Sequence, residues 1–311
     1  MIQTPFSKIL VALDGSLTSE SSLRFLEPVL PAKGNVEIML LTVVESTDQP
    51  NLNTAEQYLS RVISDFKINL NLIESNVNWH VEAIGIKTAE PGRPPSKKHI
   101  ADAISAFSKS NEIDLIILAS NGWSGSDKWL VGPVSEHVIQ STNASVMLVR
   151  GDFVIQADNL EVKKILVPLD GSEDAEMAFD YAVEILMKEN QQDAEMGIVY
   201  VRPPKDGPAS KFMRPNFDFR PLFQGNEFSY LSHLIKKNEG NHIRFGITIE
   251  HGDPGPKICS LADEMQTQLI VITSHGRGGK SKYNYGKVAD DVMHSSPVPV
   301  LILRVLNGYA S

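Results

Sequence analysis

Short apolar runs alternate with amphipathic stretches through residues 164–303. The run KILVPLD at 164–170 is continuously apolar apart from its ends, as expected of a parallel strand buried on both faces. The next stretch, SEDAEMAFDYAVEILMKEN at 172–190, predicts a helix with Ser172 as a suitable N-cap. Its apolar residues at helical spacing are Met177, Ala178, Tyr181, Ala182, Ile185 and Leu186.

The same alternation continues to residue 303. We expect further strands at 197–201, 244–252, 269–274 and 298–303, and further helices at 228–238, 256–265 and 285–296. The order βαβαβαβαβ predicts a parallel sheet with helices on both faces and right-handed crossovers. Ligands of such sheets bind beyond the carboxyl ends of the strands, where the strand order reverses. The residues that directly follow strands are therefore the candidates for a binding site.

The chain contains this pattern twice. Residues 8–16 (KILVALDGS) and 164–172 (KILVPLDGS) are identical at eight of nine positions, so Asp14 corresponds to Asp170. The offset of 156 is about half of the 311 residues. Later in each copy IDLIILASNG matches TQLIVITSHG, and Gly132 corresponds to Gly286. We infer a duplication, with domains at 1–152 and 162–307 separated by a polar segment.

Composition narrows the function classes. The formal net charge is −9 and the pI is near 5.4, which argues against a nucleic-acid-binding domain that neutralises phosphates. Apolar runs are too short to cross a membrane, and the start of the chain lacks the apolar core of a signal peptide, so we expect a cytoplasmic protein. The single cysteine, Cys259, excludes an internal disulfide, and we expect it to be buried.

Three strand ends of the second copy could carry chemistry. Asp170 is at the tip of the first, and Gly171 permits a tight turn into the following helix. Val201 ends the second strand. A glycine-rich loop follows the fourth and leads to a helix start, and such backbone favours anions because its amides and the helix dipole are both positive. Arg277, Lys280 and Lys287 add positive charge there.

The openings KILVALDGS and KILVPLDGS, the loop SHGRGG and the ending SSPVPVLIL resemble the universal stress protein family, in particular its tandem two-domain members. The resemblance implies two doubly wound, Rossmann-like domains. The family's nucleotide signature is G-x2-G-x9-G followed by Ser or Thr. Its four positions fall on Thr273, Gly276, Gly286 and Lys287 in the second copy and on Ala119, Gly122, Gly132 and Pro133 in the first. Each copy keeps two of the four residues.

The resemblance further implies binding of ATP, ADP or AMP, with Mg²⁺ carried by the nucleotide. The implied contacts in the second copy are Pro168, Asp170, Val201, Ile272, Thr273, Gly276, Arg277, Gly286, Lys287 and Val288. Those of the first copy, Asp14, Val43, Leu118, Ala119, Gly122 and Gly132, rank second. Pro133 offers neither an amide donor nor a hydroxyl, whereas Lys287 keeps its amide and adds an ammonium group.

The aspartates and the glycines of these sites each have a purely structural alternative role. Asp14 and Asp170 could form Asx turns or place a charge at a helix N-terminus. The glycines could serve tight packing between strand and helix. A near match to a P-loop at 274–281 is set aside, because it follows the fourth strand of its copy, whereas a P-loop normally follows an early strand. His275 is best explained by a loop hydrogen bond, and the histidine spacing supports no metal site.

The resemblance also bears on partners. In the family the final edge strands meet across a two-fold axis, so we expect the strands at 144–150 and 298–304 to pair as an internal pseudo-dimer, with room for a further homodimer and an unidentified protein partner. The segment RPPKDGPASKFMRPNFDFRPLFQG at 202–225 is an insertion of the second copy, and it could be a lid, a docking surface or a mobile insertion.

Two functions remain open from the sequence. The first is a stress-response protein that binds an adenine nucleotide mainly in the second domain, with a regulatory role and at most weak ATPase activity. The second is a scaffold module that binds no nucleotide and acts through protein contacts.

Overall fold

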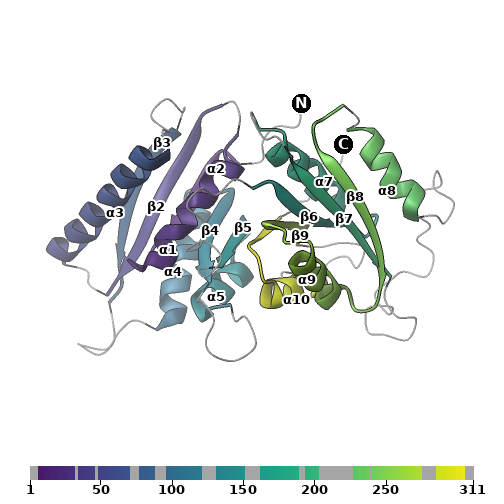
Figure 1. Ribbon diagram of the computed structural model, residues 1–311. Helices are drawn as coiled ribbons and strands as arrows, with labels where there is room; N and C mark the ends of the chain where they lie inside the picture. Colours follow the sequence, from purple (N-terminus) through teal and green to yellow (C-terminus); the bar gives the residue numbers. More distant parts are fainter. Residues whose placement is uncertain are drawn as a thin grey trace. The chain divides into compact units, whose positions relative to one another are not determined.

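The structure is a computed structural model that describes residues 6–31, 34–45, 48–70, 77–87, 96–120, 131–150, 162–188, 193–202, 227–238, 240–274 and 285–304. The chain forms two compact units, unit 1 at Met1–Leu160 and unit 2 at Glu161–Ser311. Helices and strands alternate within each of them (Figure 1).

Unit 1 is drawn from purple to teal in Figure 1. Its strands are β1 (Lys8–Ala12), β2 (Val36–Val44), β3 (Val77–Gly85), β4 (Leu115–Ser120) and β5 (Ser145–Arg150). Its helices are α1 (Leu17–Ser21), the 3₁₀ helix η1 (Ser22–Phe25), α2 (Leu26–Val29), α3 (Gln49–Leu70), α4 (Lys97–Ser110) and α5 (Pro133–Ser141).

Unit 2 repeats this order of elements. Its strands are β6 (Lys164–Pro168), β7 (Glu195–Arg202), β8 (Arg244–His251), β9 (Leu269–Thr273) and β10 (Val300–Leu303). Its helices are α7 (Glu173–Leu186), α8 (Glu227–Lys236), α9 (Pro254–Glu264) and α10 (Lys287–Ser295). The expected elements are present, although α9 begins two residues before the expected 256 and α10 two residues after the expected 285.

The strand order is β3-β2-β1-β4-β5 in unit 1 and β8-β7-β6-β9-β10 in unit 2. Each neighbouring pair within a unit is parallel; Leu10, for example, is in register with Met39 of β2 and Ile116 of β4. The chain first moves outward from β1 to β3 and then returns to the other side of β1. Right-handed crossovers therefore put α4 and α5 on the opposite face of the sheet from α3. The predicted doubly wound α/β fold is confirmed in both units.

The central strands are buried on both faces, as their continuous apolar runs predict. Ile9, Leu10 and Val11 of β1 have no exposed surface, and the same is true of 165–167 in β6. Helix α7 covers the sheet of unit 2 with a buried face that includes Ala178, Ala182 and Ile185. Met177, which the helical spacing assigned to this face, is 43% exposed, because it lies about a quarter-turn away from the line of 178, 182 and 185.

The first crossover differs between the units. In unit 2 it is one 14-residue helix, α7, whereas in unit 1 it is divided into α1, η1 and α2. The hydroxyls of Ser19, Ser21 and Ser22 each donate to the carbonyl three residues earlier, at 2.6–2.9 Å. These side chains compete for the carbonyls of the helix and favour the tighter 3₁₀ turn. The serine-rich sequence of the first copy explains the difference.

Helices α9 and α10 approach each other closely at Gly255. A Cβ atom at this position would lie 2.4 Å from the Cβ of Asp291, inside van der Waals contact. Glycine is therefore required by packing here, and not by the backbone conformation.

We expect Gly255→Ala to reduce the free energy of unfolding by about 1–3 kcal/mol, because the methyl group would force the two helices apart. Gly246→Ala is the matched control, since a Cβ atom at Gly246 would have nothing within 4 Å. Urea unfolding of both variants measures the difference, and equal stabilities would contradict the packing argument.

Strands β5 and β10 each end the strand order of their own unit. Their pairing as a pseudo-dimer remains a prediction, which native-state hydrogen exchange can test. If the edges pair, the β5 amides that point away from β4 should exchange as slowly as those that point toward it. Fast exchange at those alternate amides would contradict the pseudo-dimer.

Candidate functional site

The carboxyl ends of neighbouring strands bring most of the expected residues to one edge of unit 2. Strand β6 pairs with β7 on one side and with β9 on the other, so Pro168, Val201 and Thr273, which lie at or next to the carboxyl ends of these strands, share one edge of the sheet. This edge is where the strand order reverses, between β6 and β9. Val201, Ile272 and Thr273 are buried there, whereas Pro168, Asp170, Gly286 and Val288 are half-buried and Lys287 is exposed.

The same edge exists in unit 1 between β1 and β4. Asp14 is exposed, Val43 is half-buried, and Leu118 and Gly132 are buried. Ala119 lies on β4, where its carbonyl accepts a hydrogen bond from Ser135 of α5 at 3.1 Å. The two units therefore present corresponding residues at corresponding edges.

The turn Asp-Gly-Ser after the first strand has one geometry in both units. The Oδ1 atom of Asp170 accepts hydrogen bonds from the amide of Ser172 at 3.0 Å and from its hydroxyl at 2.6 Å. Asp14 and Ser16 make the same two bonds at the same distances. This is the Asx turn that the sequence left open as an alternative.

Glycine and serine complete the turn. Gly15 and Gly171 adopt φ values of +82° and +80°, a conformation that glycine reaches without strain. The hydroxyl of Ser172 then accepts a hydrogen bond from the amide of Ala175 at 3.1 Å, which confirms Ser172 as the N-cap of α7. Ser16 caps α1 in the same way, through the amide of Ser19. Each aspartate is thereby held at a helix N-terminus and at the reversal of strand order.

The surroundings of Asp14 have opposing effects on its pKa. Partial desolvation of the carboxylate raises the pKa, but the hydrogen bonds that Ser16 and Ser19 make with it lower the pKa more, so the net value is below 3.8. The ionised form is the form that the turn stabilises.

A glycine is also the N-cap of the helix before the final strand in each unit. Gly286 precedes α10 and Gly132 precedes α5, and a glycine N-cap offers no side chain to bond the amides of its helix. In unit 2 the amides of Lys287, Val288 and Ala289 precede the first helical bond, which Asp290 donates to Gly286. In unit 1 proline occupies the first of the three positions, so one amide donor fewer is available.

The end of the glycine-rich loop is fastened to the strand that precedes it. The amide of Gly286 donates to the carbonyl of Ser274 at 2.7 Å, and the amide of Ser274 donates to the carbonyl of Leu303 on β10 at 2.9 Å. The start of α10 therefore lies beside the carboxyl end of β9. Thr273 and Ser274 are buried at this junction.

The ammonium group of Lys287 forms ion pairs with two carboxylates of its own unit. It bonds Asp291, one turn further along α10, and lies 3.8 Å from Asp253, the N-cap residue of α9. The hydrogen bond to Asp291 is the main cause of the raised pKa of Lys287, with Asp253 and Asp290 contributing charge.

Sequence reasoning missed an arginine at this edge in each unit. Arg150, the last residue of β5, is 1% exposed and donates to the hydroxyl of Ser120 at 3.4 Å. Arg304 follows β10, and its guanidinium lies 3.9 Å from the ring centre of Tyr285. Burial raises the pKa of Tyr285 to about 12 although Arg304 opposes this. The signal in the sequence was an arginine directly after the last apolar run of each copy.

Two further contacts were also missed because they join different elements. Tyr58 of α3 donates to Glu20 of α1 at 2.8 Å, and Tyr230 of α8 donates to Glu176 of α7 at 3.2 Å. These bonds link the helix that carries the Asp-Gly-Ser turn to the helix after the second strand. Both units have this bond, although Tyr58 and Tyr230 are 172 residues apart and the repeat offset is 156.

In unit 2 a bidentate ion pair joins a residue before the insertion to a residue after it. Arg202 at the end of β7 donates from Nε and Nη2 to the two carboxylate oxygens of Glu227, at 2.9 and 2.6 Å. The insertion itself, from 203 onward, lies outside the described residues, as do Gly122, Gly276, Arg277, Lys280 and His275.

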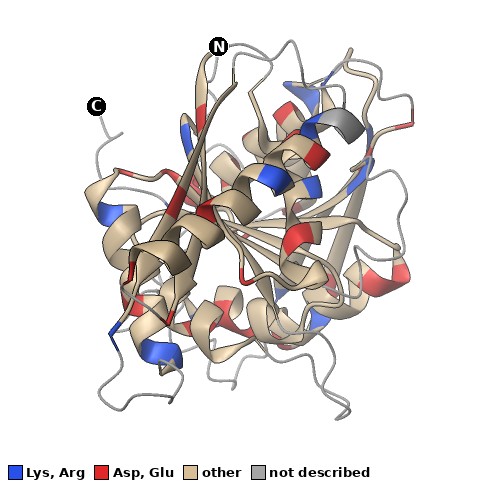
Figure 2. Cartoon of the chain, turned by 90° about the vertical axis from the view of Figure 1, so that its left-hand side faces the viewer, with Lys and Arg blue, Asp and Glu red and all other residues tan. Residues whose placement is uncertain are grey.

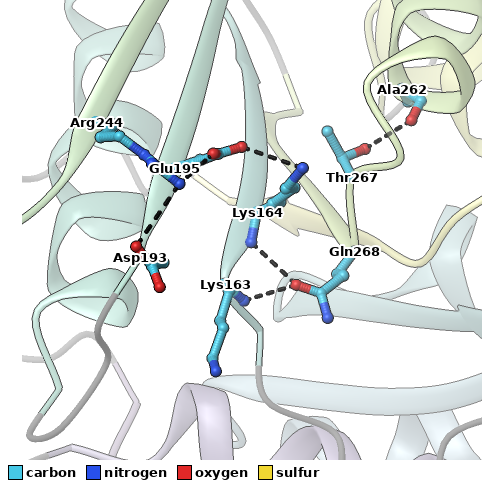
Figure 3. A network of polar contacts seen from close by, with 8 residues as sticks. All are labelled: Lys163, Lys164, Asp193, Glu195, Arg244, Ala262, Thr267 and Gln268. Atoms are coloured by element: carbon cyan, nitrogen blue, oxygen red, sulfur yellow. Dashed lines mark hydrogen bonds and ion pairs between the residues drawn. The ribbon is translucent and has the colours of Figure 1, made fainter.

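A second group of charged residues lies at the opposite edge of the sheet of unit 2. Figure 3 shows a network at the amino ends of β6, β7 and β8, where Glu195 bonds both Lys164 at 3.2 Å and Arg244 at 2.5 Å. Gln268 accepts from the amides of 163 and 164, and Asp114 has this role in unit 1. The carboxyl-end site is thus separate from this network. Figure 2 shows acidic and basic residues interspersed over the helices and strands that are visible from this side.

The described part of the chain contains neither a membrane-spanning helix nor a cluster of metal-ligating side chains. Among those residues, no helix is long and apolar enough to cross a membrane. Within the same ranges, no group of three or more histidine, cysteine, aspartate or glutamate residues could hold a metal ion. Cys259 is buried in α9, as expected.

The Asx turn predicts a pH-dependent contribution of Asp14 to stability. Because the folded-state pKa is lowered, the stabilisation is present above the unfolded-state pKa and is lost as the pH falls through the folded-state value. We expect wild type to be more stable than Asp14→Asn at pH 7, with a difference that disappears between about pH 4 and pH 2. A difference that does not change with pH, measured by urea unfolding, would contradict a stabilised carboxylate.

Comparisons with known proteins agree with this architecture. The model of the universal stress protein family matches residues 5–150 and again residues 161–304. The universal stress protein Rv2005c of Mycobacterium tuberculosis is 26% identical over 204 residues, which are 63% of this chain and 63% of that protein. The chain thus spans less than two thirds of the length of this relative.

A solved structure that covers almost the whole chain shows the same fold. A universal stress protein from Archaeoglobus fulgidus matches 97% of this chain and 99% of its own, with a TM-score of 0.59 and 20% identity. An Arabidopsis thaliana family member solved with AMP bound matches 48% of this chain and 96% of its own, with a TM-score of 0.33 and 17% identity. Because the family model matches twice and the two matches together cover nearly the whole chain, the chain belongs to the universal stress protein family and is a tandem, two-domain member.

Proposed function

We propose that this stress protein binds an adenine nucleotide, ATP, ADP or AMP, mainly in unit 2, and that it acts by regulation and not by efficient catalysis. The observation that carries the proposal is the start of α10. Three amides precede its first helical bond, its N-cap glycine has no side chain to bond them, and the amide of Gly286 bonds the carbonyl of Ser274 directly after β9. Such a helix start attracts phosphate groups through its amides and its dipole.

The neighbouring residues suit the remainder of the ligand. Asp170 lies at the reversal of strand order with its carboxylate fixed by the Asx turn, so it can accept hydrogen bonds from ribose hydroxyls. Val201 and Ile272 are buried near the carboxyl ends of β7 and β9, the two strands that flank β6, and offer apolar surface for a base. Gly276 and Arg277, implied by the family resemblance, would complete the phosphate contacts. Mg²⁺ would accompany a di- or triphosphate through the nucleotide.

Unit 1 is proposed as the weaker site. Pro133 removes an amide donor from the start of α5, and the side chain of Ser135 already donates to Ala119. Asp14 keeps the Asx turn, so unit 1 retains the aspartate that would bind ribose but has one amide donor fewer for phosphate. A further homodimer and a protein partner remain expectations from the resemblance, and a cytoplasmic location remains an expectation from the short apolar runs of the sequence.

Titration with AMP, ADP and ATP·Mg²⁺, followed by thermal unfolding, tests the proposal. A ligand present at 100 times its Kd should add roughly 2.7 kcal/mol to the free energy of unfolding. Asp170→Ala should abolish most of the increase, whereas the matched change Asp14→Ala should leave most of it.

The outcomes separate the two functions. Stabilisation that depends on Asp170 supports nucleotide binding in unit 2. No stabilisation by any of the three nucleotides would contradict it and favour the scaffold alternative, and equal losses in the two variants would contradict the ranking of the units.

A further inference from the structure

Lys287 has a position that suits a phosphate ligand, but its ammonium group already has partners. It is the first residue of α10, directly after Gly286, and its side chain bonds Asp291. Asp253 lies 3.8 Å away. The lysine side chain therefore extends toward carboxylates of α10 and of the start of α9.

The packing of the two helices holds this arrangement in place. Gly255 has no Cβ, so α9 approaches the Cβ of Asp291 closely, and Asp291 is only 29% exposed. Asp253 stands two residues before Gly255 and makes no cap bond with its own helix. Both carboxylates thus lie at the junction between α9 and the beginning of α10.

Electrostatics favours these pairs over an unpaired lysine. A positive charge at a helix N-terminus opposes the helix dipole, and nearby carboxylates offset this cost. A phosphate group that approaches the amides of α10 meets the same carboxylates as negative charges. It also has to compete with Asp291 for the ammonium group.

We propose that Asp291, assisted by Asp253, lowers the affinity of unit 2 for phosphate-bearing ligands by holding the Lys287 ammonium group, so that this carboxylate pair sets the nucleotide affinity. The inference rests on the proposed nucleotide site. Unit 1 has no counterpart of this arrangement, because Pro133 replaces the lysine and His137, at the position of Asp291, bonds Asp102 at 2.7 Å instead.

A double-mutant cycle tests the proposal on the full chain. Calorimetric titration with AMP and with ATP·Mg²⁺ is carried out on wild type, Asp291→Asn, Lys287→Met and the double variant. Asp291→Asn keeps the shape of the side chain at the close helix contact and removes its charge. We expect it to tighten binding about twofold to fivefold, the range of exposed ion pairs.

The coupling between the two residues is the decisive quantity. Lys287→Met should weaken binding at least about twofold more in the Asp291→Asn background than in wild type, because only there is the ammonium group released. The gain from Asp291→Asn should shrink between about 50 and 300 mM salt as screening increases. Asp263→Asn, which removes a charge from the exposed end of α9, serves as the control and should leave the affinity unchanged.

Each result has one meaning. If wild type and Asp291→Asn both bind no nucleotide, the proposed function fails and this inference fails with it. If wild type binds and Asp291→Asn binds no tighter than Asp263→Asn, or if the losses from Lys287→Met are equal in both backgrounds, only this inference is overturned. Should Asp291→Asn fold poorly by its thermal transition, Asp253→Asn replaces it, with a smaller gain expected from its longer separation.

Discussion

The parallel pairing of β6 with β9, and of β1 with β4, is the constraint on which the rest of each unit depends. The connections that leave the two central strands run over opposite faces of the sheet, so no crossover covers the point where the carboxyl ends of these strands meet. The central residues of β1 and β6, at 9–11 and 165–167, are fully buried, whereas the residues that follow these strands lie at the uncovered edge. Polar groups placed directly after these strands, such as Asp170 and Ser274, are held by main-chain bonds and not by side-chain packing alone.

Duplication preserved this constraint and allowed the surroundings to diverge. The Asp-Gly-Ser turn has the same bonds and nearly the same glycine φ in both units. The start of the last helix differs, with a proline in α5 and an amide-bearing lysine in α10. The serine-rich first crossover of unit 1 is another divergence. Equal folds therefore do not imply equal sites.

Much of the fold could be predicted from the sequence because its determinants are local. Buried parallel strands require continuous apolar runs, and Ser172 caps a helix through a bond to a residue three positions away. For Asp170 the sequence allowed either a ligand contact or an Asx turn. The bonds to Ser172 show the Asx turn, and they are compatible with a ligand contact by the same carboxylate. Met177 was assigned to the wrong side of α7 because a run of apolar residues gives the face of a helix only approximately.

The interactions that could not be predicted join residues from separate elements. The position of Asp253 beside Lys287 depends on how closely α9 approaches α10, which the missing Cβ atom of Gly255 permits. The buried Arg150 and the stacking of Arg304 on Tyr285 depend on where the final strand ends relative to the glycine-rich loop. The bonds Tyr58–Glu20 and Tyr230–Glu176 lie outside the aligned segments of the repeat. A single sequence gives no register between such elements.

The central claim is that two copies of one fold carry one competent nucleotide site. The stoichiometry of AMP binding to the intact chain, measured by isothermal titration calorimetry, tests it most directly. The account predicts one bound nucleotide per chain at concentrations that saturate unit 2. Two equivalent sites per chain, or none, would contradict it.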